Sequence, residues 1–374
     1  MVFRKLLTSG KIIMDYNDSN INRLLDAIMF RTTDRVPHLE HWINKKTIEY
    51  VLGREVGDPL DPYDQEKIIE NPLNPLDLVE FAQKIGQDAI SYDFVWGFGF
   101  IYKEAHDGTT HYIDGMYKNW DDIRDLRLPD IQSSINQFNK YYQACLGTGV
   151  GIYPILRSVF DTVYLAIGLK DFMLKIYDDL RFINYLMDFA LEHYYNISIE
   201  ITRNFDNIPF VLIADDLAGT NGLMIDPIRF RDLYTSRLNK ILEPFHKKNI
   251  PIVFHCDGNL NNVIPFLIEC GILGAHPVQP SCNDIYHLKK KYNGKFALFG
   301  NIETVLLANG PREKIENDVM KHCGSLKEGG GYILGSSSSI FDGIPPENFL
   351  SMVRAVHKYG KYYKKNNIIS GVKI

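Results

Sequence analysis

Residues 250–259 read IPIVFHCDGN, an apolar run that stops abruptly at a histidine, an aspartate and a glycine. The β-branched first half is typical of a buried strand. Because side chains alternate along a strand, His255 and Asp257 point to the same side of the chain at the strand's carboxyl end. In α/β folds that end of the sheet is where catalytic groups collect. The stretch therefore predicts a parallel sheet with a metal half-site or an acid–base pair at its mouth.

Short apolar runs of this kind alternate with helical patterns along most of the chain. The predicted strands cover residues 35–40, 87–94, 149–156, 209–215, 251–257, 272–278, 296–301 and 331–336. The predicted helices cover residues 76–85, 170–178, 180–203, 227–247, 260–270, 284–292, 311–323 and 346–359. This alternation predicts an α/β fold with a parallel sheet, and eight units indicate a (β/α)8 TIM barrel. An open doubly wound sheet is the alternative, but the nucleotide fingerprint that it often carries is missing.

Two segments lie outside the bare repeat. Residues 1–34 form an N-terminal extension with a helix at about 21–30, and residues 35–374 are expected to form one barrel domain. Residues 95–148 are long for a single crossover and hold the aromatic, glycine-broken segment WGFGF at 96–100. We interpret 95–148 as an inserted cap near the barrel mouth, with a purely structural insertion as the equal alternative.

The composition is that of an ordinary globular protein. Of 374 residues 45% are hydrophobic and 23% charged, and the net charge of −5 comes without a long basic run. Nucleic acid and anionic membranes are therefore poor partners. The five cysteines are scattered without a CxxC pair, as is typical of a reducing compartment. No apolar run is long enough for a membrane span, and residues 1–13 do not read as a signal peptide. We expect a cytoplasmic protein.

Polar side chains follow nearly every predicted strand. Bringing several charged side chains out of water to one edge of a sheet costs desolvation free energy, and a fold rarely needs such a cluster for its stability. Their convergence therefore points to function. In chain order they are Glu40 and His41, Tyr92 and Asp93, Tyr153 and Arg157, Asp215 and Asp216, His255 and Asp257, His276 and Gln279, Asn301, and the serines 336–339.

Several of these residues have a plain structural interpretation as well. Asp257 could cap the helix that follows it, and His255 could be a satisfied polar residue at a strand end. One of Asp215 and Asp216 is expected to hold the adjacent loop, and we favour Asp216 for the site. A metal bound by His255 and Asp257 would take a third ligand from another strand, namely Asp216, His276 or Glu40.

Seven segments in matching order carry a family resemblance. They are DRVP at 34–37, GLKDF at 168–172, DDLAG at 215–219, HCDGN at 255–259, GNI at 300–302, GGYIL at 330–334 and PPEN at 345–348. With them the chain resembles the uroporphyrinogen decarboxylase superfamily in its corrinoid-linked methyltransferase branch. The resemblance implies a TIM barrel with its site at the carboxyl ends of the strands.

The branch follows from departures from the family patterns. Decarboxylases of the superfamily grip the substrate's carboxylates with an arginine-rich segment, and here residues 38–44 read HLEHWIN without an arginine. Coenzyme M methyltransferases of the superfamily hold zinc through His-x-Cys and a distant Cys. His255 matches that histidine, Asp257 stands in place of the first cysteine, and the serines 336–339 occupy the region of the second. The resemblance thus implies a harder N/O metal site, suited to polarising a substrate oxygen or nitrogen.

The predicted function is transfer of a methyl group between a small methoxy or methylamine compound, as in O-demethylation, and a corrinoid carried by a separate protein. A cobalamin-binding Asp-x-His-x-x-Gly motif is absent from the sequence. Two alternatives remain, a metal-free decarboxylase or lyase of a small acid and a non-catalytic ligand-binding barrel. The assigned roles are zinc ligands for His255 and Asp257, catalysis for Asp216, His276 and Glu40, and substrate contacts for Tyr92, Trp96, Tyr153, Asn301 and Ser337.

Overall fold

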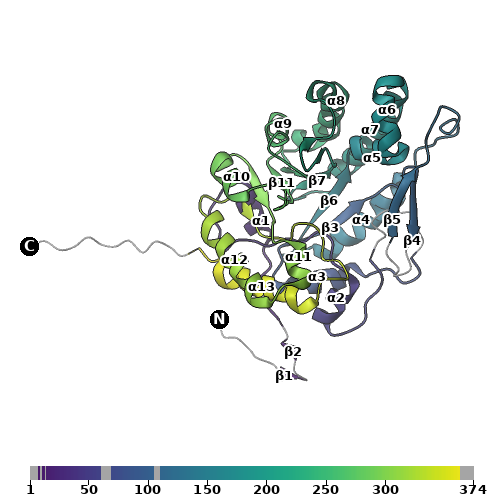
Figure 1. The fold of residues 1–374 in the computed structure, drawn as a ribbon. Coiled ribbons are helices and arrows are strands. Elements are labelled where there is room, and N and C mark those ends of the chain that lie inside the picture. The colour runs from purple at the N-terminus through teal and green to yellow at the C-terminus, as the bar shows by residue number, and fades with distance from the viewer. Residues whose placement is uncertain (1–6, 9–10, 13, 60–68, 105–109, 363–374) are drawn as a thin grey trace, which may run out of the picture.

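Seven parallel strands form one curled sheet at the centre of the molecule (Figure 1). The computed structural model describes residues 7–8, 11–12, 14–59, 69–104 and 110–362. Along the sheet the strand order is β13-β12-β11-β10-β7-β6-β3, so neighbours in the sheet follow one another in the chain. The strands are β3 (Ala89–Phe94), β6 (Gly151–Arg157), β7 (Val211–Ala214), β10 (Ile252–His255), β11 (Gly274–His276), β12 (Ala297–Phe299) and β13 (Tyr332–Ile333).

Helices surround this sheet, as Figure 1 shows, and those between consecutive strands make the parallel connections. The alternation confirms the predicted α/β class and a TIM-barrel-like arrangement. The helices are α1 (Ile21–Ile28), α2 (Lys45–Leu52), α3 (Pro75–Ile85), α4 (Ile131–Cys145), α5 (Phe160–Ile167), α6 (Leu169–Asp178), α7 (Leu180–Asn204), α8 (Pro227–Lys247), α9 (Ile264–Glu269), α10 (Ile285–Tyr292), α11 (Thr304–Asn309), α12 (Arg312–Leu326) and α13 (Pro346–Tyr359).

The predicted first strand, residues 35–40, is not a regular strand, and that prediction is wrong. The segment is extended beside β13, where the N–H of Leu39 donates to the carbonyl of Leu334 at 2.9 Å, but it makes only isolated bridges. Pro37 has no N–H to give to a ladder. On the other side the amide of Gln87 bonds the segment's backbone in place of a backbone ladder. A side-chain contact therefore joins this segment to the β3 edge.

The inside of the curled sheet is filled by residues that alternate along the strands. Tyr153 lies completely buried there and stacks on Phe210 with 4.4 Å between ring centroids. A larger apolar cluster fills the layer between the sheet and its helices. Each fully buried large side chain contributes about 1.5–3 kcal/mol to folding. The inner cluster comprises Leu24, Ala27, Ile28, Leu39, Ala89, Tyr153, Ile155, Phe210, Leu212, Ala214, Val253, Ala297, Phe299 and Ile333.

An antiparallel hairpin lies within the predicted insertion 95–148. Its strands are β4 (Phe100–Glu104) and β5 (Thr110–Gly115), and it projects at the edge of the molecule in Figure 1. The hairpin base packs directly on α5, because a Cβ on Gly115 would come within 2.3 Å of the backbone of Ala166. The helix α4 in the same range contacts β3 and β6 as a crossover helix. The role of the hairpin as a cap stays a prediction.

Other predictions concern the ends of the chain. The helix α1 lies inside the predicted range 21–30. Much of the predicted extension before residue 14, and residues 363–374 of the predicted barrel domain, lie outside the described residues. Among the described helices none combines the length and the apolar character needed to cross a bilayer.

Candidate active site

Three acidic and imidazole groups meet at the carboxyl ends of β7 and β10. Asp216, His255 and Asp257 each place one donor atom within 4.8 Å of the other two. The two strands are paired in register, and the loops that follow them are tied together because the N–H of Asp257 donates to Oδ1 of Asp216 at 2.9 Å. Gly258, which follows Asp257, has a φ of 87°, a value that favours glycine. A Cβ at this position would come within 2.4 Å of the carbonyl oxygen of Ala218 in the loop after β7, so only glycine fits here.

The donor set of this cluster fits a metal cation. Burial raises the pKa of the Asp257 carboxyl, Asp216 raises it further, and His255 opposes the rise. One oxygen of Asp257, Oδ1, is buried without a hydrogen-bond partner among the described residues. Zinc binds N and O donors at about 2.0–2.2 Å, so ligands at the corners of a tetrahedron lie about 3.3–3.6 Å apart. Donor atoms within 4.8 Å of one another reach this spacing by approaching by up to about 1.5 Å, and a shared ion would give Oδ1 of Asp257 a partner.

Two further histidines stand behind this cluster, inside the sheet. Nδ1 of His276 lies 2.8 Å from Nδ1 of His255, and the ring of His41 meets that of His276 edge-on with 3.9 Å between centroids. Nδ1 of His41 is hydrogen-bonded to the hydroxyl of Tyr153. Burial lowers the pKa of His276 and of His41 well below the ordinary range, so both rings are neutral near pH 7. The ring of Trp42 meets that of His255 at 90°, with 5.5 Å between ring centroids.

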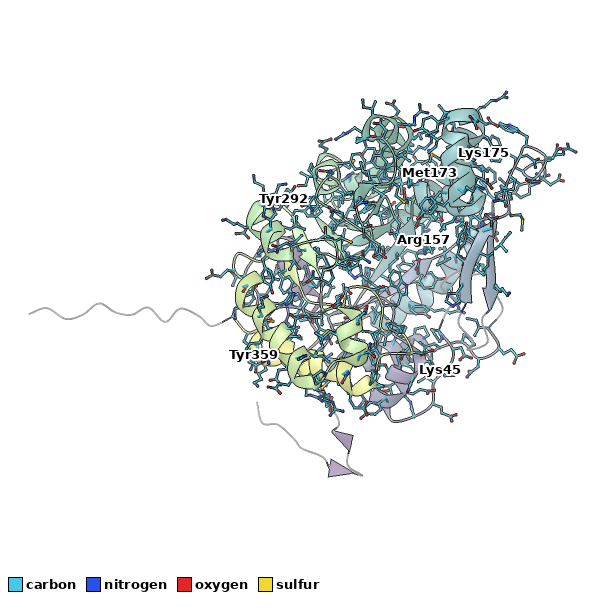
Figure 2. The ribbon with its side chains drawn as sticks, in the orientation of Figure 1. Lys45, Arg157, Met173, Lys175, Tyr292 and Tyr359 are labelled. Carbon is cyan, nitrogen blue, oxygen red and sulfur yellow. The ribbon has the colours of Figure 1, made fainter. Side chains whose placement is uncertain are left out.

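A network of carboxylates around one guanidinium borders the cluster. Arg157 bonds Asp161 at 2.9 Å, and the two side chains are 22% and 2% exposed. Figure 2 shows Arg157 toward the middle of the molecule, with the labelled lysines at its perimeter. Burial would lower the pKa of Arg157, but Asp161 and Asp93 raise it. Burial raises the pKa of Asp93 to about 6. The charge of Asp216 also acts on Asp161, so the network around Arg157 is electrostatically coupled to the candidate metal site.

The structure places two predicted substrate residues elsewhere. Tyr92 is 3% exposed and packs against Phe138 and Tyr141 of α4, on the outer face of β3. The alternation of the strand gives the inner face to Asp93, so the choice of Tyr92 has the wrong phase. Trp96 packs against Phe98 and against His193 of α7, at centroid distances of 4.3 and 4.4 Å. The contacts given for the two side chains are packing contacts, and their role in binding a substrate stays a prediction.

Asn301 and Ser337 also serve the scaffold. The amide of Asn301 donates to the carbonyl of Val278, and its oxygen lies 2.9 Å from Nε2 of His322 on α12. It lines a cavity of about 620 Å³ between α10, α11 and α12. The hydroxyl oxygen of Ser337 accepts from the N–H of Thr304 at the start of α11. These contacts turn both side chains away from the inner face. Tyr153 does lie on the inner face, but below the histidines and fully buried.

Of the two adjacent aspartates after β7, Asp215 holds the chain and Asp216 joins the cluster. Asp215 accepts the N–H groups of Phe160 and Asp161 at 3.0 and 2.6 Å, which fixes the start of α5. A carboxylate at the start of a helix accepts hydrogen bonds from the free N–H groups there and interacts favourably with the positive end of the helix dipole. This anchoring also sets the position of Asp161 and, through it, of Arg157.

Glu40 is engaged with the loop after β13. Its Oε1 accepts the N–H of Ser336, and its Oε2 lies 2.7 Å from the hydroxyl of Ser336. That hydroxyl is also 3.0 Å from the carbonyl of Ser338. A hydroxyl has one proton, so Ser336 donates it either to the carboxylate of Glu40 or to the carbonyl of Ser338, and in the second case a protonated Glu40 donates to Ser336. Burial raises the pKa of Glu40 to about 7, against the opposing bonds from Ser336.

Replacing this carboxyl with an amide should change how stability depends on pH. Between pH 4.5, the ordinary pKa, and about 7, the folded chain keeps the proton of Glu40 and the unfolded chain releases it. The free energy of unfolding therefore falls as pH rises through this window. The variant Glu40→Gln lacks this titration and should gain about 3 kcal/mol on the wild type from pH 4.5 to 7.5. Urea unfolding across that range measures the gap, and parallel curves would refute the protonated carboxyl.

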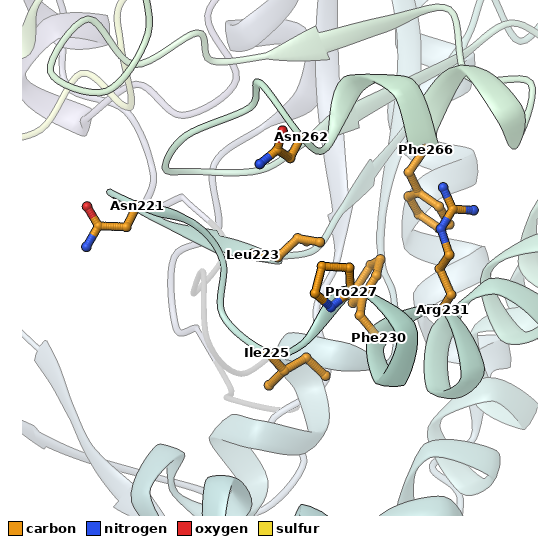
Figure 3. Close-up of a pocket in the computed structure, with 8 residues that line it drawn as sticks. All are labelled: Asn221, Leu223, Ile225, Pro227, Phe230, Arg231, Asn262 and Phe266. Atoms are coloured by element: carbon orange, nitrogen blue, oxygen red, sulfur yellow. The ribbon is translucent and has the colours of Figure 1, made fainter.

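A second cavity lies outside the cluster. It has a volume of about 360 Å³ and is bordered by the hairpin β8 (Ala218–Gly219) and β9 (Gly222–Leu223) and by the starts of α8 and α9. In Figure 3 Asn221 lies at one end, and Arg231 lies beside Phe266 at the other. None of the predicted site residues lines it.

The sequence is related to known enzymes over most of its length. The model of the uroporphyrinogen decarboxylase (URO-D) family matches residues 96–359. The chain belongs to this family. The family resemblance of the sequence motifs is thereby confirmed.

Curated uroporphyrinogen decarboxylases match a smaller part of the chain than the family model does. A uroporphyrinogen decarboxylase of Pseudoalteromonas atlantica is 29% identical over 154 residues, which is 39% of this chain and 41% of that protein. One of Legionella pneumophila is 27% identical over 162 residues, 41% of this chain and 45% of that protein. The chain thus matches less than half the length of these curated relatives.

A solved structure matches nearly end to end. A methyltransferase from Methanosarcina mazei superposes with a TM-score of 0.69 at 19% identity, covering 91% of this chain and 99% of that one. At this identity the likeness shows the shared fold.

Proposed function

We propose that this URO-D family protein is a methyltransferase that moves a methyl group between a small methoxy or methylamine compound and a corrinoid carried by a separate protein. The observation that carries the proposal is the N/O donor cluster of Asp216, His255 and Asp257 at the carboxyl edge of the sheet. The Methanosarcina mazei protein that shares this fold is a methyltransferase, which agrees with a methyltransferase activity of this chain. The sequence given holds no Asp-x-His-x-x-Gly motif, which agrees with a corrinoid carried by a partner.

The three residues of the cluster would hold zinc. When bound, the metal supplies Lewis acidity to the oxygen or nitrogen that leaves the methyl group. The chain's own part is to fix the donors: the N–H of Asp257 donates to Asp216, and the ring of His255 contacts both His276 and Trp42. Rigid donors keep the substrate's heteroatom in one position and cost little reorganisation during the reaction.

The charge of the mouth supports a small substrate without carboxylates. Three carboxyl groups, those of Asp93, Asp161 and Asp216, interact there with the guanidinium of Arg157, and Asp257 interacts in turn with Asp216. A substrate with many carboxylates would meet like charges and would lack arginine partners. The acidic border instead favours a metal cation and a neutral or cationic methyl compound.

A second candidate function is decarboxylation, as the names of the curated relatives suggest. It needs no zinc, so the two functions separate on metal dependence. The third reading, a barrel that binds a ligand without catalysis, predicts neither methyl transfer nor decarboxylation.

Methyl transfer to cob(I)alamin tests the proposal. We expect zinc-loaded protein to methylate this probe from at least one member of a panel of methoxy and methylamine donors, followed by the change in the cobalamin spectrum. Removing zinc with a chelator should abolish the reaction, and adding zinc back should restore it. Chelator-resistant decarboxylation of uroporphyrinogen or a small acid, without methyl transfer from any donor, would contradict the proposal and favour the second candidate.

A further inference from the structure

The orientation of His255 is set by an unusual neighbour, the imidazole of another histidine. Nδ1 of His255 lies 2.8 Å from Nδ1 of His276, a hydrogen-bond distance, and the two rings are nearly stacked at 29° with centroids 5.0 Å apart. The two residues are also partners in the pairing of β10 with β11. The contact is therefore built into the register of two neighbouring strands.

We propose that His276 is a positioning residue for the metal site: it accepts a hydrogen bond from Nδ1–H of His255 and so reserves Nε2 of His255 for the metal. The inference rests on the proposed zinc site. A neutral imidazole has one ring proton, and the nitrogen that binds a metal cannot carry it. With Nδ1 facing His276, the tautomer that leaves Nε2 unprotonated is the one in which His255 donates. Metal-binding histidines ordinarily have such a partner on the other nitrogen, and the partner strengthens metal binding.

The surroundings of His276 suit this role. The side chain is 1% exposed, and its Nε2 has no hydrogen-bond partner among the described residues. Its ring is held from behind by the edge-on contact with His41, which in turn is bonded to Tyr153. Among the described residues, the contact through Nδ1 is the one side-chain hydrogen bond of His276. The opposite hydrogen-bond direction would place a proton on Nε2 of His255, and that tautomer cannot bind a metal.

Two substitutions of the same shape separate hydrogen bonding from packing. Asparagine keeps a polar group near the position of Nδ1, and leucine has the same outline without it. Zinc affinity is measured by competition with a chromophoric chelator, independently of any reaction. We expect His276→Leu to bind zinc about 10–100-fold more weakly than the wild type, and His276→Asn to recover to within about threefold. Urea unfolding of the metal-free variants controls for stability.

A second measurement reads the tautomer itself. In ¹⁵N spectra of the histidine side chains of the zinc-loaded protein, we expect the ring of His255, identified by its loss in His255→Ala, to carry its proton on Nδ1. A proton on Nε2 overturns the inference. So does equal zinc affinity of wild type and His276→Leu, or an equal loss in both variants, which would make His276 a packing residue. If the wild type itself takes up no zinc, the proposed function fails, and the inference fails with it.

Discussion

Replacing His255 with alanine should remove bound zinc and lower the rate of methyl transfer by at least about a thousandfold, the equivalent of several kcal/mol of Lewis-acid stabilisation. His255 is the only nitrogen donor in the cluster with Asp216 and Asp257 among the described residues. Oδ1 of Asp216 already accepts a hydrogen bond from the backbone N–H of Asp257, and without His255 the two carboxylates alone would hold a cation less firmly. The measurements are zinc content per chain and kcat/KM for methylation of cob(I)alamin.

A matched control is available on the outer side of the molecule. His287 is an exposed histidine on α10 and does not belong to the cluster, so His287→Ala should keep both zinc and rate. A His255→Ala protein that still binds zinc at wild-type stoichiometry, or that transfers methyl groups at the wild-type rate, would contradict the assignment of His255 as a ligand.

Replacing Arg157 with methionine should destabilise the fold by about 3–5 kcal/mol near neutral pH, because the change leaves buried carboxylates without their cation. The bonded partner, Asp161, is only 2% exposed, and Asp93 is also paired with this charge. Methionine keeps most of the apolar stem, so the loss reports the charge and not the packing. Urea unfolding at pH 7.5 measures the effect.

The loss should also depend on pH in a defined direction. Without the guanidinium, Asp161 and Asp93 hold their protons to higher pH in the folded chain than in the unfolded chain. The variant therefore loses stability as pH rises, and its deficit is smaller at pH 5 than at pH 7.5. The control is Arg231→Met, because Arg231 pairs with Glu269 at the surface, where both side chains are about half exposed. That change should cost no more than about 1 kcal/mol. Equal effects of the two substitutions would refute the buried network.

The ends of helices were predictable from the sequence where the residues at or next to the helix end carry the signal. The bounds of α8 and α13 agree with the predicted ranges 227–247 and 346–359, and each helix has a proline in its first turn. Asp226 adds a side-chain cap to α8. In contrast, the helix α4 was not predicted within the insertion 95–148. Its sequence is only weakly apolar, and one face of the helix becomes buried through packing on the sheet.

The part of the site that follows regular strands was also predictable. Asp216, His255 and Asp257 follow two strands whose alternation and ends are plain in the sequence, and the structure brings them together. His41 was among the polar side chains expected at the mouth but received no role, and Trp42 was not singled out. Both follow the irregular segment 35–40, where no ladder fixes the direction of side chains. Tyr92 was chosen over Asp93 by a phase error of one residue, which moves a side chain to the opposite face.

The most direct test of the metal site is anomalous scattering from crystals of zinc-loaded protein, recorded at energies on both sides of the zinc absorption edge. The account predicts one strong peak per chain, within bonding distance of Nε2 of His255 and of carboxylate oxygens of Asp216 and Asp257. No peak at this position in a zinc-loaded crystal, or a peak bound by other residues, would contradict it.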